Sequence, residues 1–426
     1  MTASVHQTEH LLFFVLLQLI IMVGAARLLN TLFRRLGQPG VIGEIVAGLM
    51  LGPSLFGHFF PDLSARIFGT SASPPIAILS QIGLILLMFQ IGGEFAFDHL
   101  RSGRYRAATL WVAAGAIVTP LILGFGFGWL SAGALAGGVD PLIFSLFCAV
   151  AVSITAMPVL GRILREYSLT SEAIGVVAIA AAAINDLIGW ILLGSLAAYA
   201  TAQFSGGLVL SELAAIAAGA AALWFVLRPL TAWAMRAFPM RGERLGPDMI
   251  ALVLCLIFAL GLATNAIGIF TMFGGFAAGL LFHRDQDFVE AWRRQVGQFV
   301  LVFFLPVFFT FTGLRTQILG LSSLSDLAWL ALLLALSVLG KIAPVYLAAR
   351  ACGFARAQSL ALGSLMNTRG LMELIVLNVG YDLGFLPQKA FTMLVIMALA
   401  TTVMTGPLLQ VLLPRMGHAP TERESA

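Results

Sequence analysis

The hydrophobic residues of this chain gather into long runs that are separated by short polar stretches. Most runs approach the roughly 20 residues that an α-helix needs to cross the hydrocarbon core of a bilayer. The pattern therefore predicts an all-α polytopic membrane protein with about 13 transmembrane helices. The predicted segments are 10–30, 39–57, 75–96, 107–131, 141–164, 172–200, 206–228, 247–266, 268–282, 297–314, 325–349, 357–380 and 389–413.

The composition supports a membrane protein and argues against other classes. Hydrophobic residues make up 60% and charged residues 10% of the 426 residues, whereas soluble domains carry about 25% charged residues. The net charge of +4 is too small to indicate a nucleic-acid partner. Cys148, Cys255 and Cys352 lack the spacing of a disulfide framework or a metal site. We expect a protein of the lipid bilayer that needs no cofactor.

The basic residues predict how the segments are oriented. Loops after odd-numbered segments, together with the C-terminal stretch, hold 19 of the 24 Lys and Arg residues. Loops after even-numbered segments hold only Arg66, Arg315 and Lys389. Because cytoplasmic loops carry the excess of positive charge, we expect the C-terminus in the cytoplasm and the N-terminus outside. We expect the membrane to be a bacterial inner (plasma) membrane.

Parts of the sequence resemble one another. IGEIVAGLMLG at 42–52 resembles FGGFAAGLLFH at 273–283, and FQIGGEF at 89–95 resembles FTFTGLR at 309–315. The members of each pair lie seven segments apart, an odd number, so they run in opposite directions across the bilayer. Weak symmetry of this kind is typical of inverted-repeat transporters, although Gly-rich apolar sequences also resemble one another by chance.

These patterns predict a single transmembrane domain at 1–414. The inverted repeats are expected at about 39–200 and 268–413, with linker helices between them, and 415–426 is expected to be a short cytoplasmic tail. The first apolar run follows a start without Lys or Arg, unlike the basic region of a signal peptide. We therefore expect it to be retained as the first helix.

The fifth and twelfth segments, also seven apart, each contain a helix-breaking stretch. In SITAMPVLGRIL, Pro158 lies near mid-span, and a proline removes a backbone donor and obstructs the carbonyl one turn earlier. In SLMNTRGLMELI, the interruption consists of Asn367, Thr368, an arginine and Gly370. Two opposed broken helices in matching positions indicate an ion site near the bilayer midplane. For Pro158 alone, an ordinary proline kink is the alternative.

Asp186 and the neighbouring amide Asn185 lie in the middle of a long apolar run. About 14 residues, or roughly 21 Å of helix, separate Asp186 from each end of its segment. A charge at the centre of a bilayer costs several kcal/mol unless it is compensated. Purely structural contacts rarely need a full charge beside an amide at this depth, so we predict a functional role for Asp186.

Other charged and polar residues lie at comparable depth. Lys341 and Arg369 are inside their segments, Glu373 follows Arg369 by one helical turn, and Glu44 lies in the Gly-rich second segment. These charges are either part of an ion site or pair with one another only to hold helices together. Two small polar residues precede Pro158 and can serve freed backbone groups or line a cavity; they are Ser153 and Thr155.

The combination of SITAMPVLGRIL, AINDLIGW, GKIAP and LMNTRGLMELIVLNVG resembles the membrane domain of the monovalent cation:proton antiporter-2 family. IGEIVAGLMLGPSLFG and LLMFQIGGEF match that family as well, so the resemblance covers nearly the whole chain. It implies thirteen helices in two inverted repeats with crossed discontinuous helices, a dimerisation domain and a mobile core domain, and a homodimer. Such a protein is a transporter rather than an enzyme.

The resemblance also implies roles for individual residues. Asp186 would bind the cation or the proton, Asn185 would be its polar partner, and Lys341 would interact with both. Thr155 would lie on the unwound part of the first crossing helix and Asn367–Gly370 on that of the second. Some relatives have two adjacent aspartates instead of this Asn-Asp pair, and others append a cytoplasmic nucleotide-binding domain that we do not expect here.

An exchange mechanism follows if H⁺ and a monovalent cation compete for one carboxylate. The carboxylate, the Asn185 amide oxygen, hydroxyls near Pro158 and opened-helix carbonyls suit a hard alkali cation, either Na⁺ or K⁺. If the core moves only when the site is neutralised, exchange is obligatory. Because Asn185 cannot ionise, we predict electroneutral exchange of one cation for one proton, unless Lys341 releases its own proton during the cycle.

Two other classes of protein remain as alternatives. A sodium-coupled symporter of an organic anion could have the same inverted-repeat plan and use Lys341 or Arg369 as the counter-charge. A sensor or scaffold that does not transport would normally carry an output domain. We expect none here, which disfavours this class.

Overall fold

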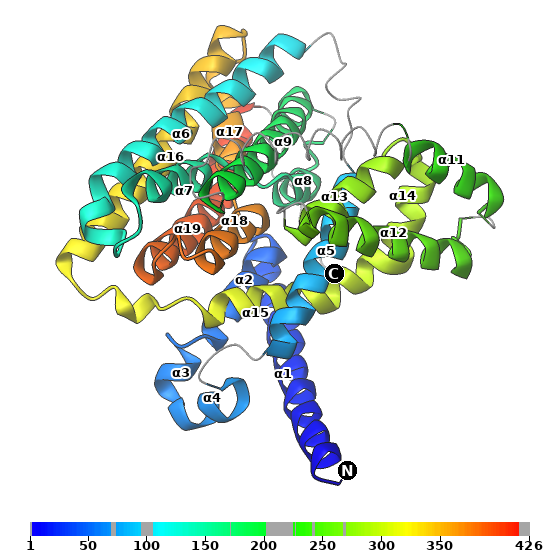
Figure 1. Cartoon of the computed structure of the whole chain (residues 1–426). Coiled ribbons are helices and arrows are strands. Elements are labelled where there is room, and N and C mark those ends of the chain that lie inside the picture. The colour runs from blue at the N-terminus through cyan, green and yellow to red at the C-terminus, as the bar shows by residue number, and fades with distance from the viewer. Residues whose placement is uncertain are drawn as a thin grey trace. The chain divides into compact units, whose positions relative to one another are not determined.

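The computed structural model of the chain describes residues 2–69, 74–94, 105–170, 172–201, 225, 227–240, 243–266 and 270–416. Its regular elements are helices, and no strand occurs among these residues, so the all-α prediction is confirmed. Figure 1 labels the helices of the chain, which divides into two compact units. Unit 1 contains Met1–Gly24, Phe60–Ala96 and Gly194–Phe311, and unit 2 contains Ala25–Phe59, Phe97–Leu193 and Thr312–Ala426.

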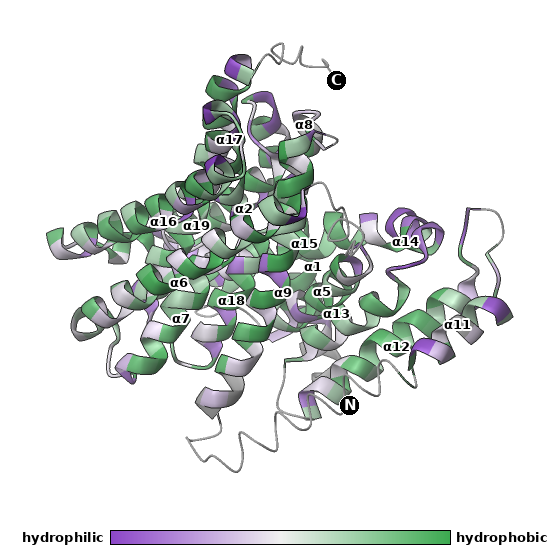
Figure 2. Cartoon of the chain, turned by 90° about the horizontal axis from the view of Figure 1, so that it is seen from above, coloured by the Kyte–Doolittle hydropathy of each residue, from purple (hydrophilic) through white to green (hydrophobic). Residues whose placement is uncertain are grey.

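Among the described residues, 10 helices are long and apolar enough to cross a membrane. Two shorter apolar helices, Pro141–Ser153 and Thr271–Phe282, also coincide with predicted segments. Figure 2 shows hydrophobic residues along most of these helices. The predicted segment 206–228 lies almost entirely outside the described residues, so the total of thirteen remains a prediction.

Unit 1 contains a close contact between α5 (Pro74–Gly93) and α13 (Thr271–Phe282). A Cβ added to Gly275 would collide with the backbone oxygen of Ile85, and one added to Gly279 with that of Phe89. Small residues therefore allow the two backbones to approach closely. The other elements of unit 1 are α4 (Pro61–Phe68), α11 (Arg228–Ala237), α12 (Pro247–Ala266), α14 (Gln286–Trp292), η3 (Arg293–Gly297) and η4 (Val300–Phe304).

Unit 2 contains long helices together with two interrupted ones. α6 (Arg106–Leu135) packs against α7 (Pro141–Ser153) and against α16 (Leu324–Ala351). The N-terminus of α7 is fixed by Asp140, whose carboxylate accepts hydrogen bonds from the amides of Leu142 and Ile143, as N-cap aspartates do. The remaining elements of unit 2 are α2 (Gly40–Leu51), α3 (Phe56–Phe59), α8 (Met157–Glu166), α17 (Arg356–Met366), α18 (Leu371–Asp382), α19 (Gln388–Leu412), η5 (Ile318–Gly320) and η6 (Pro414–Met416).

Three helices have residues in both units: α1 (Thr2–Arg35), α9 (Ala173–Thr201) and α15 (Leu305–Leu314). The similar sequences at 42–52 and 273–283 form parts of α2 and α13, which both have 12 residues and both contain the motif from their third residue onward. Equal local structure agrees with the proposed repeats, whereas their inverted relation remains a prediction.

Candidate functional site

The first helix interruption lies between α7 and α8. α7 ends at Ser153, Ile154 is extended with φ −70° and ψ 143°, and α8 begins at Met157. Pro158 is therefore the second residue of α8, a position where its missing N–H leaves no helical hydrogen bond unmade. The break precedes the proline instead of being centred on it.

The second interruption separates α17 from α18 and depends on a glycine. α17 ends at Met366, and α18 begins at Leu371. Gly370 has φ 140° and ψ −120°, a conformation that side chains with a Cβ rarely adopt. A Cβ at this position would also lie 3.2 Å from Cγ2 of Val159, on α8. The two interruptions therefore lie side by side in unit 2.

Hydrogen bonds join the two unwound segments directly. The backbone amide of Ala156 donates to the carbonyl oxygen of Thr368 at 3.1 Å. The hydroxyl of Thr155 donates to the carbonyl oxygen of Met366, also at 3.1 Å. Backbone groups that lose their helical partners inside a membrane must find others within the protein. Here each interrupted helix supplies partners for the other.

Arg369 donates hydrogen bonds to the backbone carbonyls at the C-terminal end of α7. Its guanidinium donates to the carbonyl oxygens of Ala151 at 3.0 Å and Val152 at 2.7 Å. It also lies 3.6 Å from the carboxylate of Glu373, and both side chains are fully buried. A cation is favourable at the negative end of the helix dipole, and Glu373 balances its charge. The predicted pairing of Arg369 with a glutamate is thus present.

Lys341, on α16, binds the same helix end with a different set of acceptors. Its ammonium donates to the carbonyl oxygen of Ala116 at 2.8 Å, to that of Ser153 at 2.5 Å and to the hydroxyl of Thr155 at 2.7 Å. An ammonium has three hydrogens, so these neutral oxygens account for all of them. Within the described part of the chain, Lys341 forms no ion pair with Asp186.

Asp186 lies on α9 with its carboxylate open. Both Asp186 and Asn185 are 1% exposed. Neither carboxylate oxygen accepts a hydrogen bond from a described residue, and the amide oxygen of Asn185 is likewise without a donor. The amide nitrogen of Asn185 donates to the Thr155 hydroxyl at 3.2 Å. The backbone N–H of Met157, at the start of α8, interacts with the carboxylate but does not complete a hydrogen bond to either oxygen.

The other predicted ligands are placed differently. Thr155 donates one hydrogen bond and accepts two, which is the full capacity of a hydroxyl. The Ser153 hydroxyl donates to the carbonyl of Val150 within its own helix. Asn367 is fully buried, and neither atom of its side-chain amide has a partner among the described residues. The polar atoms of the region without a hydrogen-bond partner therefore belong to Asp186, Asn185 and Asn367, and also to the ion pair of Arg369 and Glu373, which is balanced in charge.

Glu44 lies on α2 and interacts with α1. Its carboxylate accepts a hydrogen bond from the side-chain amide of Asn30 at 2.5 Å and lies 3.8 Å from the guanidinium of Arg27. Glu44 is only 3% exposed. These contacts fit the structural alternative, in which the carboxylate helps to hold α1 against α2.

Two threonines of α19 that the motif analysis did not single out support the second interruption. The Thr402 hydroxyl accepts from the amide of Arg369 at 3.0 Å and lies within hydrogen-bond distance of that residue's own carbonyl. The Thr405 hydroxyl contacts the carbonyl of Ser364 and the hydroxyl of Thr368. The polar stretch TTVMT within an apolar helix was the available signal.

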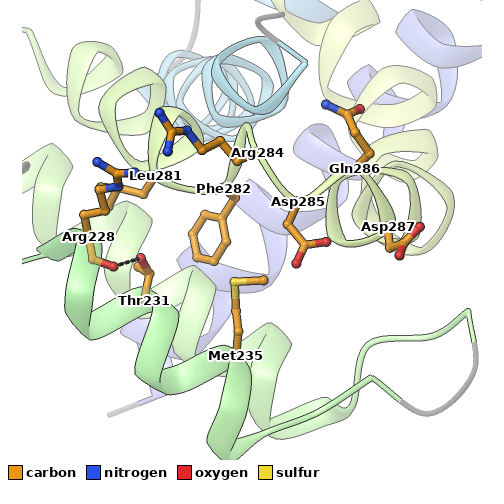
Figure 3. Close-up of a pocket in the computed structure, with 9 residues that line it drawn as sticks. All are labelled: Arg228, Thr231, Met235, Leu281, Phe282, Arg284, Asp285, Gln286 and Asp287. Atoms are coloured by element: carbon orange, nitrogen blue, oxygen red, sulfur yellow. Dashed lines mark hydrogen bonds between the residues drawn. The ribbon is translucent and has the colours of Figure 1, made fainter.

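A separate pocket of about 450 Å³ lies in unit 1, between residues of α11, α13 and α14 (Figure 3). Figure 3 shows Arg228 and Arg284 on one side and Asp285 and Asp287 on the other. Asp285 also caps α14 by accepting from the amide of Phe288. Because the formal charges of these four side chains cancel, the pocket has no clear preference for a charged ligand. None of the predicted ion-site residues lines it.

Comparison with known proteins gives consistent relatives. Residues 19–414 match the family described as sodium/hydrogen exchanger, transmembrane. The chain is 35% identical to the Na(+)/H(+) antiporter NhaS4 of Synechocystis over 96% of this chain and 99% of that protein. It is 36% identical to Cation/H(+) antiporter 17 of Arabidopsis thaliana and 31% identical to K(+)/H(+) antiporter 1 of Saccharomyces cerevisiae, covering 94% of this chain in each case. The chain spans only 48% and 46% of the lengths of those two proteins.

A solved structure shares the fold. The sodium proton antiporter MjNhaP1 of Methanocaldococcus jannaschii matches with a TM-score of 0.63 over 95% of this chain and 98% of that one. At 18% identity this likeness establishes the fold alone. The match over residues 19–414 and the near full-length relative at 35% identity establish more. This integral membrane protein belongs to the sodium/hydrogen exchanger family of transporters.

Proposed function

We propose that this protein exchanges a monovalent cation, Na⁺ or K⁺, for H⁺ across the membrane, with Asp186 as the shared binding site. The observation that carries the proposal is the open carboxylate of Asp186, which is 1% exposed and accepts no hydrogen bond from a described residue. A buried charge without a partner is strongly unfavourable. A proton or an alkali cation supplies the missing compensation, and only one of them occupies the carboxylate at a time.

The polar atoms around the carboxylate suit a hard cation. The amide oxygen of Asn185 is open beside it, and the side-chain amide of Asn367 on the second interruption is also unpartnered. Oxygen ligands are the ones that hard cations prefer. Thr155 acts in this proposal as a junction that holds Asn185, Lys341 and Met366 together, since its hydroxyl is saturated.

In this proposal, the charged residues near Asp186 already have partners, so the binding of one proton or one monovalent cation to Asp186 neutralises the site. Arg369 is balanced by Glu373 and bonded to α7. Lys341 places all three of its hydrogens on neutral oxygens, and such bonds favour its charged form. In this proposal Lys341 keeps its proton through the cycle, which the voltage clamp described below tests. Asn185 cannot ionise, so Asp186 alone titrates and the exchange is one cation for one proton, without net charge transfer.

The transport cycle proposed here is of the elevator type. All residues of the site lie in unit 2, which we take as the mobile core of the protein. A bare carboxylate resists movement through the hydrocarbon layer, whereas a loaded one does not. The inverted repeats, the homodimer and the cytoplasmic C-terminus in a bacterial inner membrane belong to the same proposal. The organic-anion symporter is not favoured, because the relatives are antiporters by name.

Proton flux in proteoliposomes that contain a pH-sensitive dye tests this function. Na⁺, K⁺, Li⁺ and choline are added in turn to the wild type, to Asp186→Asn and to Glu44→Gln. We expect cation-dependent flux in the wild type and in Glu44→Gln, because Glu44 is a buried carboxylate that pairs with α1. Asp186→Asn keeps the shape of the side chain and should lose the flux. Retained exchange in folded Asp186→Asn protein contradicts the assignment.

A voltage clamp with valinomycin and K⁺ tests the stoichiometry in Na⁺- or Li⁺-driven assays. One-for-one exchange should be insensitive to the clamp. Acceleration by the clamp shows that a second proton moves, and its proposed source is then Lys341, which lies in the same hydrogen-bonded cluster as Asn185. The cation that drives the largest flux identifies the transported ion.

A further inference from the structure

The proline within α6 lies one turn after the residue that binds Lys341. Pro120 is inside the helix Arg106–Leu135. In an α-helix, the N–H of residue 120 would bond to the carbonyl of residue 116. A proline has no N–H, and its ring pushes the carbonyl four residues earlier away from the helix axis. That carbonyl belongs to Ala116, and it accepts a hydrogen bond from the Lys341 ammonium at 2.8 Å.

The packing of α6 against α16 brings these groups together. A Cβ added to Gly340 would lie 2.8 Å from Cδ1 of Leu123 and 3.8 Å from Cα of Pro120. A Cβ added to Gly115 would lie 3.2 Å from the carbonyl oxygen of Pro344. Each helix thus places a glycine close to the other helix's proline. This close approach of the two helices lets the Lys341 ammonium bind a backbone carbonyl of α6.

We infer that Pro120 is a positioning residue for Lys341, which leaves the Ala116 carbonyl free of a helical donor and directs it to the ammonium. With this third acceptor, the Lys341 ammonium is fully bonded at the end of α7 and does not need the Asp186 carboxylate as a partner. Pro120 thereby keeps Asp186 available for the transported ion, and this last consequence rests on the proposed function. Any other residue at 120 would supply an N–H that competes for the Ala116 carbonyl.

A double-mutant cycle measures this coupling without any transport. The variants are Pro120→Ala, Lys341→Met and the double substitution, and the readout is the melting temperature of the purified protein in detergent. We expect Pro120→Ala to lower the melting temperature by about 2 °C or more when lysine is present. In the Lys341→Met background, the same substitution should be neutral or stabilising, because the helix regains a hydrogen bond and no ammonium loses one. Equal shifts in the two backgrounds would overturn the inference.

Transport under a voltage clamp supplies the second test. The charged groups that act on Lys341 are Arg369, Glu373 and Asp186. With one acceptor fewer, Lys341 can give up its proton within this cluster, so we expect clamp-accelerated exchange in Pro120→Ala and equally in Pro120→Val. These two residues differ in volume but share the N–H. Pro344→Ala removes the other proline ring from the contact between α6 and α16 and leaves residue 120 unchanged. This variant should behave as the wild type.

The outcomes separate the two proposals. Different behaviour of Pro120→Ala and Pro120→Val, or a clamp effect in Pro344→Ala as well, would show that packing rather than the missing N–H is responsible, and would overturn the inference. If the wild type exchanges no cation, the proposed function fails, whereas the melting-temperature cycle still decides whether Pro120 acts through Lys341.

Discussion

Thr402 offers a sharp test of how the second helix interruption is held in place. This residue of α19 is 1% exposed. Its hydroxyl accepts a hydrogen bond from the backbone amide of Arg369 at 3.0 Å and can donate to the carbonyl of Arg369 at 3.0 Å or of Ala398 at 2.8 Å. Thr402→Val replaces the hydroxyl by a methyl group of similar size. The change therefore removes hydrogen bonds without creating a cavity.

The magnitude follows from the buried amide that loses its acceptor. Arg369 is fully buried, so water does not replace the hydroxyl. Leaving a buried backbone donor without a partner costs about 1–3 kcal/mol. The carbonyl of Arg369 loses a donor too, but a carbonyl tolerates this better than an amide does. We expect Thr402→Val to lower the free energy of unfolding by about 1–3 kcal/mol, and to slow exchange because Arg369 carries the bonds to α7.

Thr401 is the matched control, one residue earlier on the same helix. It is also fully buried, but among the described residues its hydroxyl bonds only to carbonyls of α19, those of Met397 at 2.9 Å and Ala398 at 3.2 Å. Thr401→Val leaves no amide unpaired, so its effect should be within about 0.5 kcal/mol of zero. Unfolding in mixed micelles of increasing SDS content measures both variants. Equal stability of Thr402→Val and Thr401→Val would refute the bracing role of α19.

Three further predictions concern other parts of the molecule. Gly370→Ala should lower the free energy of unfolding by about 1–3 kcal/mol, measured in the same micelles, because alanine disfavours φ 140° and its Cβ would press on Val159. Arg369→Lys should lower it by about 1–3 kcal/mol, since lysine cannot reproduce the fork that reaches two carbonyls of α7. Glu290 has a pKa below its ordinary value of 4.5, chiefly because Arg293 donates a hydrogen bond to it, so the stability it contributes is present above pH 4.5 and is lost as the pH falls through its lowered pKa. Hydrogen exchange of α14, corrected for intrinsic rates, should rise with acid in the wild type but not in Glu290→Gln.

The fold could be predicted from the sequence wherever the hydrophobic pattern was continuous. Predicted segments and observed helices agree closely at 247–266 and at 325–349, where α12 and α16 lie. The pattern could not show where a continuous apolar run is interrupted. Pro158 predicted a break in the first crossing helix without fixing its bounds. The structure puts the unwound residues at 154–156, just before the proline, because a proline fits the first turn of a new helix.

The composition of the site was predicted better than its connections. The motifs singled out Asp186, Asn185 and Lys341. All three residues lie in unit 2, and Thr155 links Asn185 to Lys341 by hydrogen bonds. Residue types do not show which acceptor a lysine will choose among several. Lys341 was expected to interact with the Asn-Asp pair. It acts on Asp186 through charge, but its hydrogen bonds go to Thr155 and to the carbonyls of Ala116 and Ser153. Backbone carbonyls as partners leave no signature in a sequence.

The ends of the broken helices explain why one carboxylate stays open among several buried charges. The carbonyls at the end of α7 form the negative end of a helix dipole, and Lys341 and Arg369 are both bonded to them. These two cations are therefore committed to the scaffold. Asp186 instead interacts with the backbone N–H of Met157, at the N-terminus of the separate helix α8, where the helix dipole favours negative charge but supplies no full counter-charge. A carboxylate that is tolerated but not neutralised is what a site for an exchangeable cation requires, because a permanent ion pair with Lys341 would have to be broken each time an ion binds.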